Sequence, residues 1–230
     1  VSTRLIREIH GVLLQGVRGK DRDPGHFRRT QNWIGPPDGT IHDAYFIPPP
    51  PQKVDDLLSN IEKFVHENSS YPLLVKNALI HAQFETIHPF LDGNGRVGRL
   101  LITFLLVSSG VLQRPLLYLS YYLKKHRSKY YELLNNVRFE GAWEQWIKFF
   151  LEGIYEVSQQ ATDTANNIVK LQNYDHDRLS DDANALKLLD YLYTNPMVTT
   201  NKVQEVLDVS ASTANRLVSK FEDRSILEEV

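Results

Sequence analysis

The sequence predicts an all-α protein that carries one short β-hairpin. Apolar residues recur at helical spacing through most of the chain. A Gly- and Pro-rich segment near the N-terminus separates two strand-like runs. Three short helical patterns near the C-terminus are arranged like a helix-turn-helix or winged-helix module. We therefore expect a helical first domain with a hairpin flap over residues 1–158 and a small second domain over residues 183–230.

Length and composition limit the function classes. A chain of 230 residues can form one sizeable core and a small second domain. The formal net charge is −2, so no overall attraction draws the protein to nucleic acid or to a membrane. The absence of cysteine excludes disulfides, and no apolar run approaches membrane-spanning length. We expect a cytoplasmic protein without a membrane partner. Because the first residue is Val1 and not Met, and a helical pattern begins at Leu5, the chain is interpreted as an internal piece of a longer protein.

The first elements are a helix and an irregular segment. The apolar pattern of residues 5–13 predicts a helix. Two strand-like runs, residues 31–34 and 44–47, then flank a turn-rich stretch and predict a hairpin flap over about residues 31–47. An exposed hairpin edge can pair with an extended segment of another protein. The four prolines that follow favour a stiff spacer over a ligand for an SH3-type domain.

Five further helices complete the first domain. They are expected over residues 54–67, 72–86, 97–109, 120–137 and 143–157. The helix over residues 97–109 is apolar almost all round, so we expect it at the centre of the core. The polar residues 159–182 are interpreted as a linker, with a connecting helix over 161–172 and a hinge over 173–182.

The C-terminal module is predicted to contain three helices, over residues 183–194, 200–207 and 212–222. Residues 226–230 are expected to be the first strand of a winged helix, whose following hairpin would lie beyond this sequence. The polar residues that head the third helix, including Asn215 and Arg216, permit DNA binding, but nearby acidic residues offset the cations. A protein-docking or dimer module is the alternative.

The centre of the chain contains a stretch with the chemistry of a nucleotide site, His88-Pro-Phe-Leu-Asp-Gly-Asn-Gly-Arg-Val-Gly-Arg99. An imidazole such as that of His88 can accept a proton from a hydroxyl near neutral pH. Asp92 offers the hard oxygen ligand that Mg²⁺ needs beside phosphates. The glycines let backbone N–H groups face an anion at the N-terminus of the following helix. Arg96 and Arg99 share a face of that helix and oppose its dipole, so an anion explains them better than helix stability does.

Each of these residues alone also has a structural explanation. His-Pro is commonly a turn, and Gly-Asn-Gly is commonly a loop. Asp92 could be an N-cap, and Arg99 could be a surface charge. No fold requirement asks for the whole ordered combination, which therefore favours a functional site.

The stretch resembles the Fic signature, His-x-Phe-x-Asp/Glu-Gly-Asn-Gly-Arg-x-x-Arg, and every specified position is filled. The resemblance implies a Fic helical catalytic core that transfers AMP from ATP to a Ser, Thr or Tyr hydroxyl of a target protein. It implies that His88 is the base, that Asp92 holds Mg²⁺ and that Phe90 anchors the loop. The implied ATP- and phosphate-binding residues are Gly93, Asn94, Gly95, Arg96, Val97, Gly98 and Arg99.

The same resemblance implies a role for the flap and some alternatives. In Fic proteins a flap aligns the target hydroxyl, so Trp33 and Ile34 are candidate target contacts, although packing under a loop explains them equally well. A homodimer is common in such folds. Relatives use UTP, GTP or phosphocholine-bearing donors, or remove AMP. The inhibitory pattern Ser/Thr-x-x-x-Glu-Gly/Asn of many relatives is not found in these residues. A second class of function is a transcriptional regulator or nucleotide sensor, but a sensor would have no need of His88.

Overall fold

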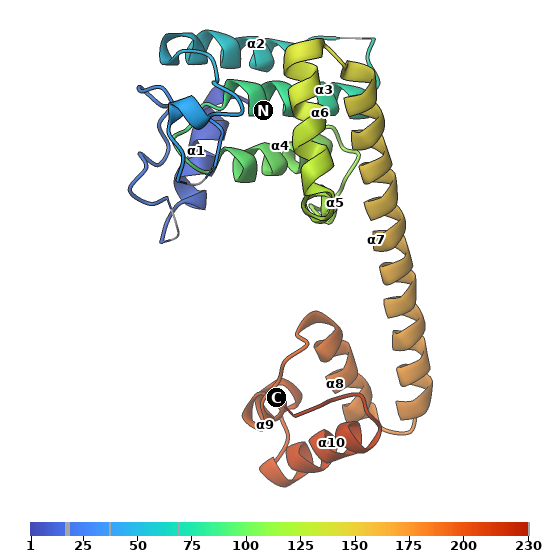
Figure 1. Ribbon diagram of the computed structural model, residues 1–230. Coiled ribbons are helices and arrows are strands. Elements are labelled where there is room, and N and C mark those ends of the chain that lie inside the picture. Colours follow the sequence, from blue (N-terminus) through green and yellow to red (C-terminus); the bar gives the residue numbers. More distant parts are fainter. Residues whose placement is uncertain (17–18, 37, 69, 230) are drawn as a thin grey trace. The chain divides into compact units, whose positions relative to one another are not determined.

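The computed structural model describes residues 1–16, 19–36, 38–68 and 70–229 (Figure 1). The chain divides into two compact units, Val1–Ala161 and Thr162–Val230. One long helix, α7 (Trp143–Leu179), begins in the first unit and ends in the second. None of the described helices is long and apolar enough to cross a membrane.

The first unit is helical. Its helices are α1 (Thr3–Leu13), α2 (Val54–His66), α3 (Leu73–Ile87), α4 (Asn94–Ser108), α5 (Leu119–Lys125), α6 (Arg127–Glu140) and the start of α7. The helix predicted over residues 120–137 is two helices, because the backbone at His126 departs from helical geometry with φ −106° and ψ 35°. Short 3-10 turns lie at Ile41–Asp43 and Pro51–Lys53.

Helix α4 lies between two clusters of buried apolar side chains. Val97, Leu101 and Leu105 pack into the cluster formed with α1, α2 and α3. Ile102 and Leu106 pack into the other cluster, formed with α3, α5, α6 and α7. Burial in both clusters explains the apolar residues on these two faces of α4, whereas Leu100 and Phe104, on the remaining face, are exposed. The predicted central position of this helix is confirmed.

The β-hairpin flap expected over residues 31–47 is not formed. Among the described residues of this segment, which exclude Pro37, the β pairing is one isolated antiparallel bridge between Ile34 and Phe46. The next hydrogen-bonded pairs of an antiparallel ladder would place Pro36 opposite residue 44 and Pro48 opposite residue 32. Proline has no N–H group to donate, so the ladder ends on both sides of the bridge.

The second unit contains the end of α7 and three short helices, α8 (Ala183–Thr194), α9 (Thr200–Leu207) and α10 (Ala211–Asp223). Asp182, Thr199 and Ser210 cap these helices with their side chains. The first two helices have the predicted bounds, and the third is one residue longer at each end than predicted. Leu188, Leu217 and Phe221 lie at the centre of their shared core.

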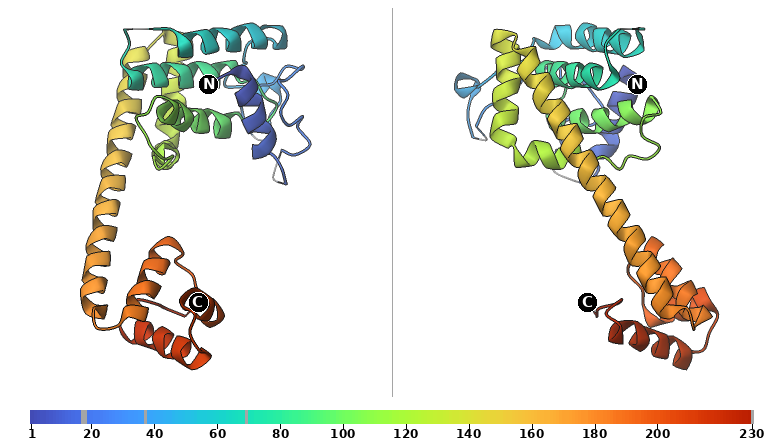
Figure 2. Two further views of the ribbon diagram at one scale, coloured as in Figure 1. Left: turned by 180° about the vertical axis from the view of Figure 1, so that it is seen from behind. Right: turned by 90° about the vertical axis from the view of Figure 1, so that its right-hand side faces the viewer.

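Two further expectations for this region are wrong. The hinge expected from residue 173 is helical as far as Leu179, and α7 runs unbroken in all views (Figures 1 and 2). The reason is packing, because Asp175 and Leu179 are buried in the second unit. The winged-helix strand is also not seen, since the described residues after α10 form no strand and Ile226 and Leu227 pack against the small core.

Candidate active site

The candidate loop joins the C-terminus of α3 to the N-terminus of α4. His88 is the C-cap of α3 in the left-handed conformation, with φ 49°, and its N–H donates to the Phe84 carbonyl at 3.0 Å. Gly93 takes φ 81° at the N-cap of α4, a conformation that favours glycine. Helix α4 therefore starts at Asn94, three residues before the predicted start at Val97. The compact turn places the signature residues 94–99 on the first two turns of α4.

The Asn94 side chain closes the loop on itself. Its Nδ2 donates to the Phe90 carbonyl at 2.7 Å, and its Oδ1 accepts from the Phe90 N–H at 2.8 Å. Asn94 is only 3% exposed. Both ends of this amide are engaged within the loop, so a contribution of Asn94 to anion binding would come through its backbone N–H.

Phe90 anchors the loop in the core by aromatic stacking. Its ring is fully buried and lies parallel to the His10 imidazole, with centroids 3.7 Å apart and an interplanar angle of 6°. The Nδ1 of His10 accepts from the Gly25 N–H at 2.8 Å, which places the ring proton on Nε2. That nitrogen donates to the Asp92 carbonyl at 3.0 Å. Burial lowers the pKa of His10, so the neutral ring that this arrangement needs is favoured.

Two polar side chains from residues 28–32 hold the backbone of the loop. Arg28 donates through Nε to the His88 carbonyl at 2.9 Å, and its own N–H donates to the Pro89 carbonyl at 2.8 Å. Asn32 donates through Nδ2 to the His88 carbonyl at 3.2 Å and to the Phe90 carbonyl at 2.9 Å. Arg28 is 3% exposed, so it is a buried cation used to fix the backbone. The segment that precedes the Ile34–Phe46 bridge is thereby tied to the candidate loop.

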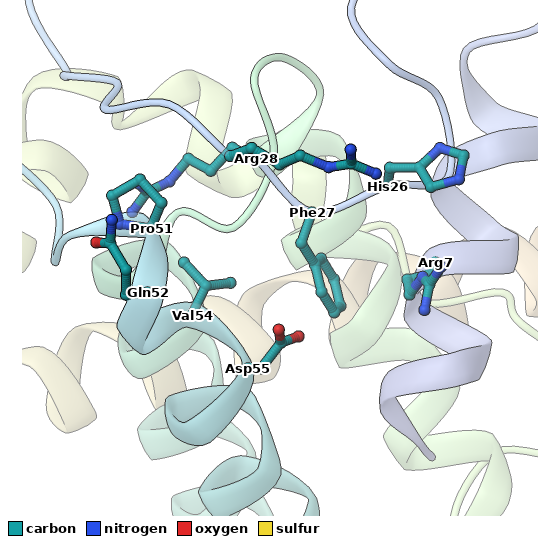
Figure 3. A pocket seen from close by; sticks show the side chains of 9 residues that line it. Arg7, His26, Phe27, Arg28, Pro51, Gln52, Val54 and Asp55 are labelled. Atoms are coloured by element: carbon teal, nitrogen blue, oxygen red, sulfur yellow. The ribbon is translucent and has the colours of Figure 1, made fainter.

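A cavity of about 350 Å³ lies next to this support (Figure 3). Phe27 and Arg28 line it together with side chains of α1 and of the start of α2. None of the described residues 88–99 lines this cavity, so it is separate from the candidate active site. Two residues that line the cavity also contact the loop. The Phe27 ring contacts Phe90, with centroids 5.3 Å apart, and Arg28 donates to the His88 carbonyl.

The environment of His88 keeps its imidazole neutral. Its Nδ1 is enclosed and has no hydrogen-bond partner among the described residues. Burial lowers the pKa of His88 to about 4, and the Arg138 and Arg28 charges add to this effect, while the Glu85 backbone opposes it. A neutral imidazole at pH 7 is able to accept a proton. Since Nδ1 is enclosed, Nε2 is the nitrogen left to meet a hydroxyl.

Gly98 and Val97 have packing roles in addition to any ligand contact. A Cβ at Gly98 would lie 2.5 Å from Glu85 Oε1, so glycine permits the close approach of α3 and α4. Val97 is 1% exposed and packs in the core. Burial raises the pKa of Glu85 to about 7, against the opposing charges of Arg99 and Arg138. About half of the Glu85 carboxyl groups are therefore protonated at pH 7.

The charged residues of the loop lie at its partly exposed end. Asp92 Oδ1 lies 3.8 Å from Arg96 Nη2, and both side chains are about one-third exposed (37% and 34%). A Cβ at Gly95 would lie 3.0 Å from Arg99 Nη1, so glycine makes room for this guanidinium group. Cations and the dipole of α4 meet here, which suits a polyanionic ligand.

Asp92 is the residue that could hold Mg²⁺. No group of three or more metal-ligating side chains occurs in the described part of the chain. Mg²⁺ commonly takes one or two carboxylates and completes its shell with water and substrate phosphates. One partly exposed carboxylate beside a phosphate-type site fits that pattern. The residues present are thus compatible with a metal that arrives together with a nucleotide.

The predicted flap residues lie on the segment that docks on the loop. Trp33 is 39% exposed, and Ile34 is half-buried and pairs with Phe46. The Ile34 N–H donates to the Phe46 carbonyl at 2.9 Å. Asn32, which precedes Trp33, attaches this segment to the loop through its hydrogen bonds to the His88 and Phe90 carbonyls.

Sequence reasoning missed the residues that support the loop, His10, Arg28, Asn32, Glu85 and Arg138. In the sequence, a histidine on an amphipathic helix or an arginine in a Gly- and Pro-rich segment has no distinguishing feature. Glu85 lies three residues before His88, but a single glutamate in a helical pattern has no distinguishing feature either. The other contacts join segments that lie far apart in the chain.

A model of the Fic/DOC family matches residues 1–106. This part of the chain is therefore similar to the Fic/DOC family. The Fic/DOC segment contains the candidate loop, Arg28 and Asn32, whereas Arg138 lies beyond it. Over 105 residues the chain is 37% identical to a probable protein adenylyltransferase of Aquifex aeolicus. The aligned residues cover 46% of this chain and 30% of that protein. It is also 32% identical over 157 residues to the protein adenylyltransferase Fic of Culex quinquefasciatus, covering 66% of this chain and 27% of that protein. The chain therefore spans less than a third of either relative.

The fold is also similar to that of a solved structure. A crystal structure of a Fic family protein from Desulfovibrio desulfuricans G20 aligns with a TM-score of 0.63 and 22% identity, covering 96% of this chain and 62% of that chain. At this identity the similarity concerns the fold alone. The all-α Fic fold expected from the sequence is confirmed.

Proposed function

We propose that this protein is a protein adenylyltransferase, which transfers AMP from ATP to a Ser, Thr or Tyr hydroxyl of a target protein. The observation that carries the proposal is the start of α4, where the backbone of residues 93–95 and the side chains of Arg96 and Arg99 lie together, close in sequence to the neutral imidazole of His88. The similarity to relatives named as protein adenylyltransferases supports the same reaction class.

In the proposed reaction the hydroxyl oxygen of the target attacks the α-phosphorus of ATP. The bond from that phosphorus to the β-phosphate oxygen breaks, and pyrophosphate leaves. The hydroxyl proton passes to Nε2 of His88, a step worth about 10²–10⁴-fold in rate when the base is well positioned. Arg96 and Arg99 hold the phosphates, and the backbone N–H groups at the start of α4 stabilise the charge that develops on them. Bound Mg²⁺ would neutralise phosphate charge, and Asp92 is the residue that would hold it.

The segment over residues 31–47 is the proposed docking site for the target. Its attachment to the loop through Asn32 would place an extended target segment near His88. Trp33 is exposed enough to contact such a segment, and Ile34 lies beside it. A target held by backbone pairing and one or two apolar contacts presents its hydroxyl in a defined place.

The test is incubation of the chain with Mg²⁺ and α-labelled ATP, UTP or GTP, with label followed on the chain itself and on added proteins. We expect label from ATP, and its loss by at least about 100-fold in His88→Ala with ATP binding retained. His66→Ala, an exchange of an exposed histidine outside the loop, is the matched control. Label from another nucleotide would keep the reaction and change the donor. Equal labelling by wild type and His88→Ala would overturn the proposal.

The second unit offers one observation in favour of a regulator or nucleotide sensor. Asn215 and Arg216 are exposed near the start of α10, where a helix-turn-helix protein contacts DNA. Against this, Lys202 pairs with Glu205 at 2.7 Å and Lys220 pairs with Asp182 at 3.0 Å, which weakens the positive surface that DNA requires. ATP binding without transfer, combined with salt-sensitive binding of duplex DNA, would favour this second function.

A further inference from the structure

Arg138 lies on α6, outside the signature, and contacts the segment proposed to dock the target. Its guanidinium carbon lies 4.2 Å from the centroid of the Phe46 ring, a close cation–π contact. Phe46 is the residue that pairs with Ile34 in the isolated bridge. The Phe139 ring lies on Phe46 edge to face, with centroids 6.0 Å apart. The one bridged position of the segment is therefore covered by side chains of α6.

The remaining contacts of Arg138 fix its orientation on the opposite side. Its Nη2 donates to the Glu85 carbonyl at 3.0 Å, and its Nε donates to Thr86 Oγ1 at 3.3 Å. Its Nη1 donates to Asn135 Oδ1 at 2.9 Å, within α6. Glu85 and Thr86 belong to the last turn of α3, which ends at Ile87 and is followed by its C-cap His88. One planar group thus joins α6, the turn that carries the catalytic base, and the docking segment.

A single β-bridge is a weak hold on a segment of this length, because isolated short β pairings are marginally stable in water. Asn32 ties the first arm of the segment to the loop. For the second arm, which contains Phe46, the stacked guanidinium of Arg138 supplies the corresponding attachment. Asn32 thus binds the carbonyls of His88 and Phe90, while Arg138 binds Glu85 and Thr86 just before His88.

We infer that Arg138 is a positioning residue, which locks the target-docking segment to the last turn of α3 and so sets the target hydroxyl against His88. This inference rests on the proposed function and names a determinant of target use in that same site. A planar guanidinium is required, because only it can stack on Phe46 while its three nitrogens donate in three directions. Lysine would keep the charge and lose this geometry.

The first experiment compares Arg138→Lys with Arg127→Lys, a matched control on the same helix. Arg127 also lies over an aromatic ring, that of Tyr131 at 5.6 Å, but it is exposed. With the acceptor protein labelled by wild type, Arg138→Lys should raise KM for that acceptor about tenfold and leave ATP affinity unchanged. Arg127→Lys should change neither quantity. If Arg138→Lys lowered both the affinity for ATP and the labelling of the acceptor, the inference would be overturned, because Arg138 would then have a general structural role.

A double-mutant cycle with Phe46→Leu tests whether the effect passes through the stack. Phe46→Leu should reproduce the rise in KM for the acceptor, and the double variant should be no worse than either single variant. Independent, additive effects would overturn the inference.

The second readout needs no catalysis. Amide hydrogen exchange is measured at Ile34 and Phe46, whose N–H groups donate across the bridge. Both Arg138→Lys and Phe46→Leu should accelerate exchange at these amides about tenfold, with no change in α4. Unchanged exchange at the bridge would overturn the inference. If wild type transfers no nucleotide but exchange rises as expected, the proposed function fails while the lock itself stands.

Discussion

Helix α4 in the first unit and helix α10 in the second begin in opposite ways. At α10, Ser210 has an extended backbone and its side chain accepts from the Thr213 N–H at 3.3 Å. At α4, the N-cap is Gly93 in the left-handed conformation, and no described side chain caps the helix. The start of α10 is completed by a side chain of its own sequence, whereas the start of α4 leaves N–H groups for another partner.

The arginines sharpen this comparison. Arg99 and Arg216 each occupy the sixth position of their helix, counted from Asn94 and Ala211. In α4 a further cation, Arg96, stands in the first turn, where it opposes the helix dipole. A helix N-terminus that lacks a side-chain cap and carries two arginines favours the binding of an anion. Four sets of substitutions test the two helix starts and the residues that pack against them.

Arg99→Met should weaken ATP binding by roughly 10- to 100-fold, because it removes charge-assisted hydrogen bonds to phosphate. Arg216→Met, at the same helix position in the second unit, should leave the Kd for ATP unchanged. Isothermal titration calorimetry measures both. An equal loss in the two variants would mean that the start of α4 is not the nucleotide site.

Asn94→Ala should lower the free energy of unfolding of the first unit by about 1–3 kcal/mol, since the buried N–H and carbonyl of Phe90 lose their partner. Asn201→Ala, an exposed asparagine of α9, should change it by less than about 0.5 kcal/mol. Urea titration of each variant gives both values. A stable, fully active Asn94→Ala would show that the loop closes without this amide.

Glu85→Gln should change how stability depends on pH. The folded-state pKa of Glu85 is raised from the ordinary 4.5 to about 7, so wild type loses this part of its stability as pH rises from about 4.5 to 7. Glutamine does not ionise, so the variant should gain stability relative to wild type across that window, by at most about 1.4 kcal/mol per pH unit. Thermal unfolding between pH 4 and 8 measures the difference, in which the histidine contributions common to both proteins cancel. Parallel pH profiles would contradict the raised pKa.

Ser210→Ala should lower the stability of the second unit by about 1 kcal/mol through loss of the cap of α10. Ser210→Asp should restore most of this loss, because aspartate caps equally well. The Kd for ATP should be the same in all three proteins. A change in ATP affinity would contradict the view that the cap of α10 is purely structural. Hydrogen exchange of the α10 amides reports the loss locally.

Sequence reasoning located most helices because each depends on a pattern within a few turns. It recovered α8 and α9 at their observed bounds, since a capping side chain precedes each of them. It failed where packing decides the local structure. The expected hinge at residues 173–182 is polar, yet buried Asp175 and Leu179 hold it in α7. The expected hairpin has strand-like residues, yet Pro36 and Pro48 end its ladder.

For the candidate site, the sequence by itself determined the chemistry, because His88, Asp92, Arg96 and Arg99 lie within twelve residues and their spacing survives any local folding. Only the tertiary structure decided how that chemistry is held. Arg28 and Arg138 reach the backbone around His88 from residues 60 and 53 positions away from their carbonyl partners. Contacts of that range depend on how distant segments pack, and packing leaves no periodic signal in the chain.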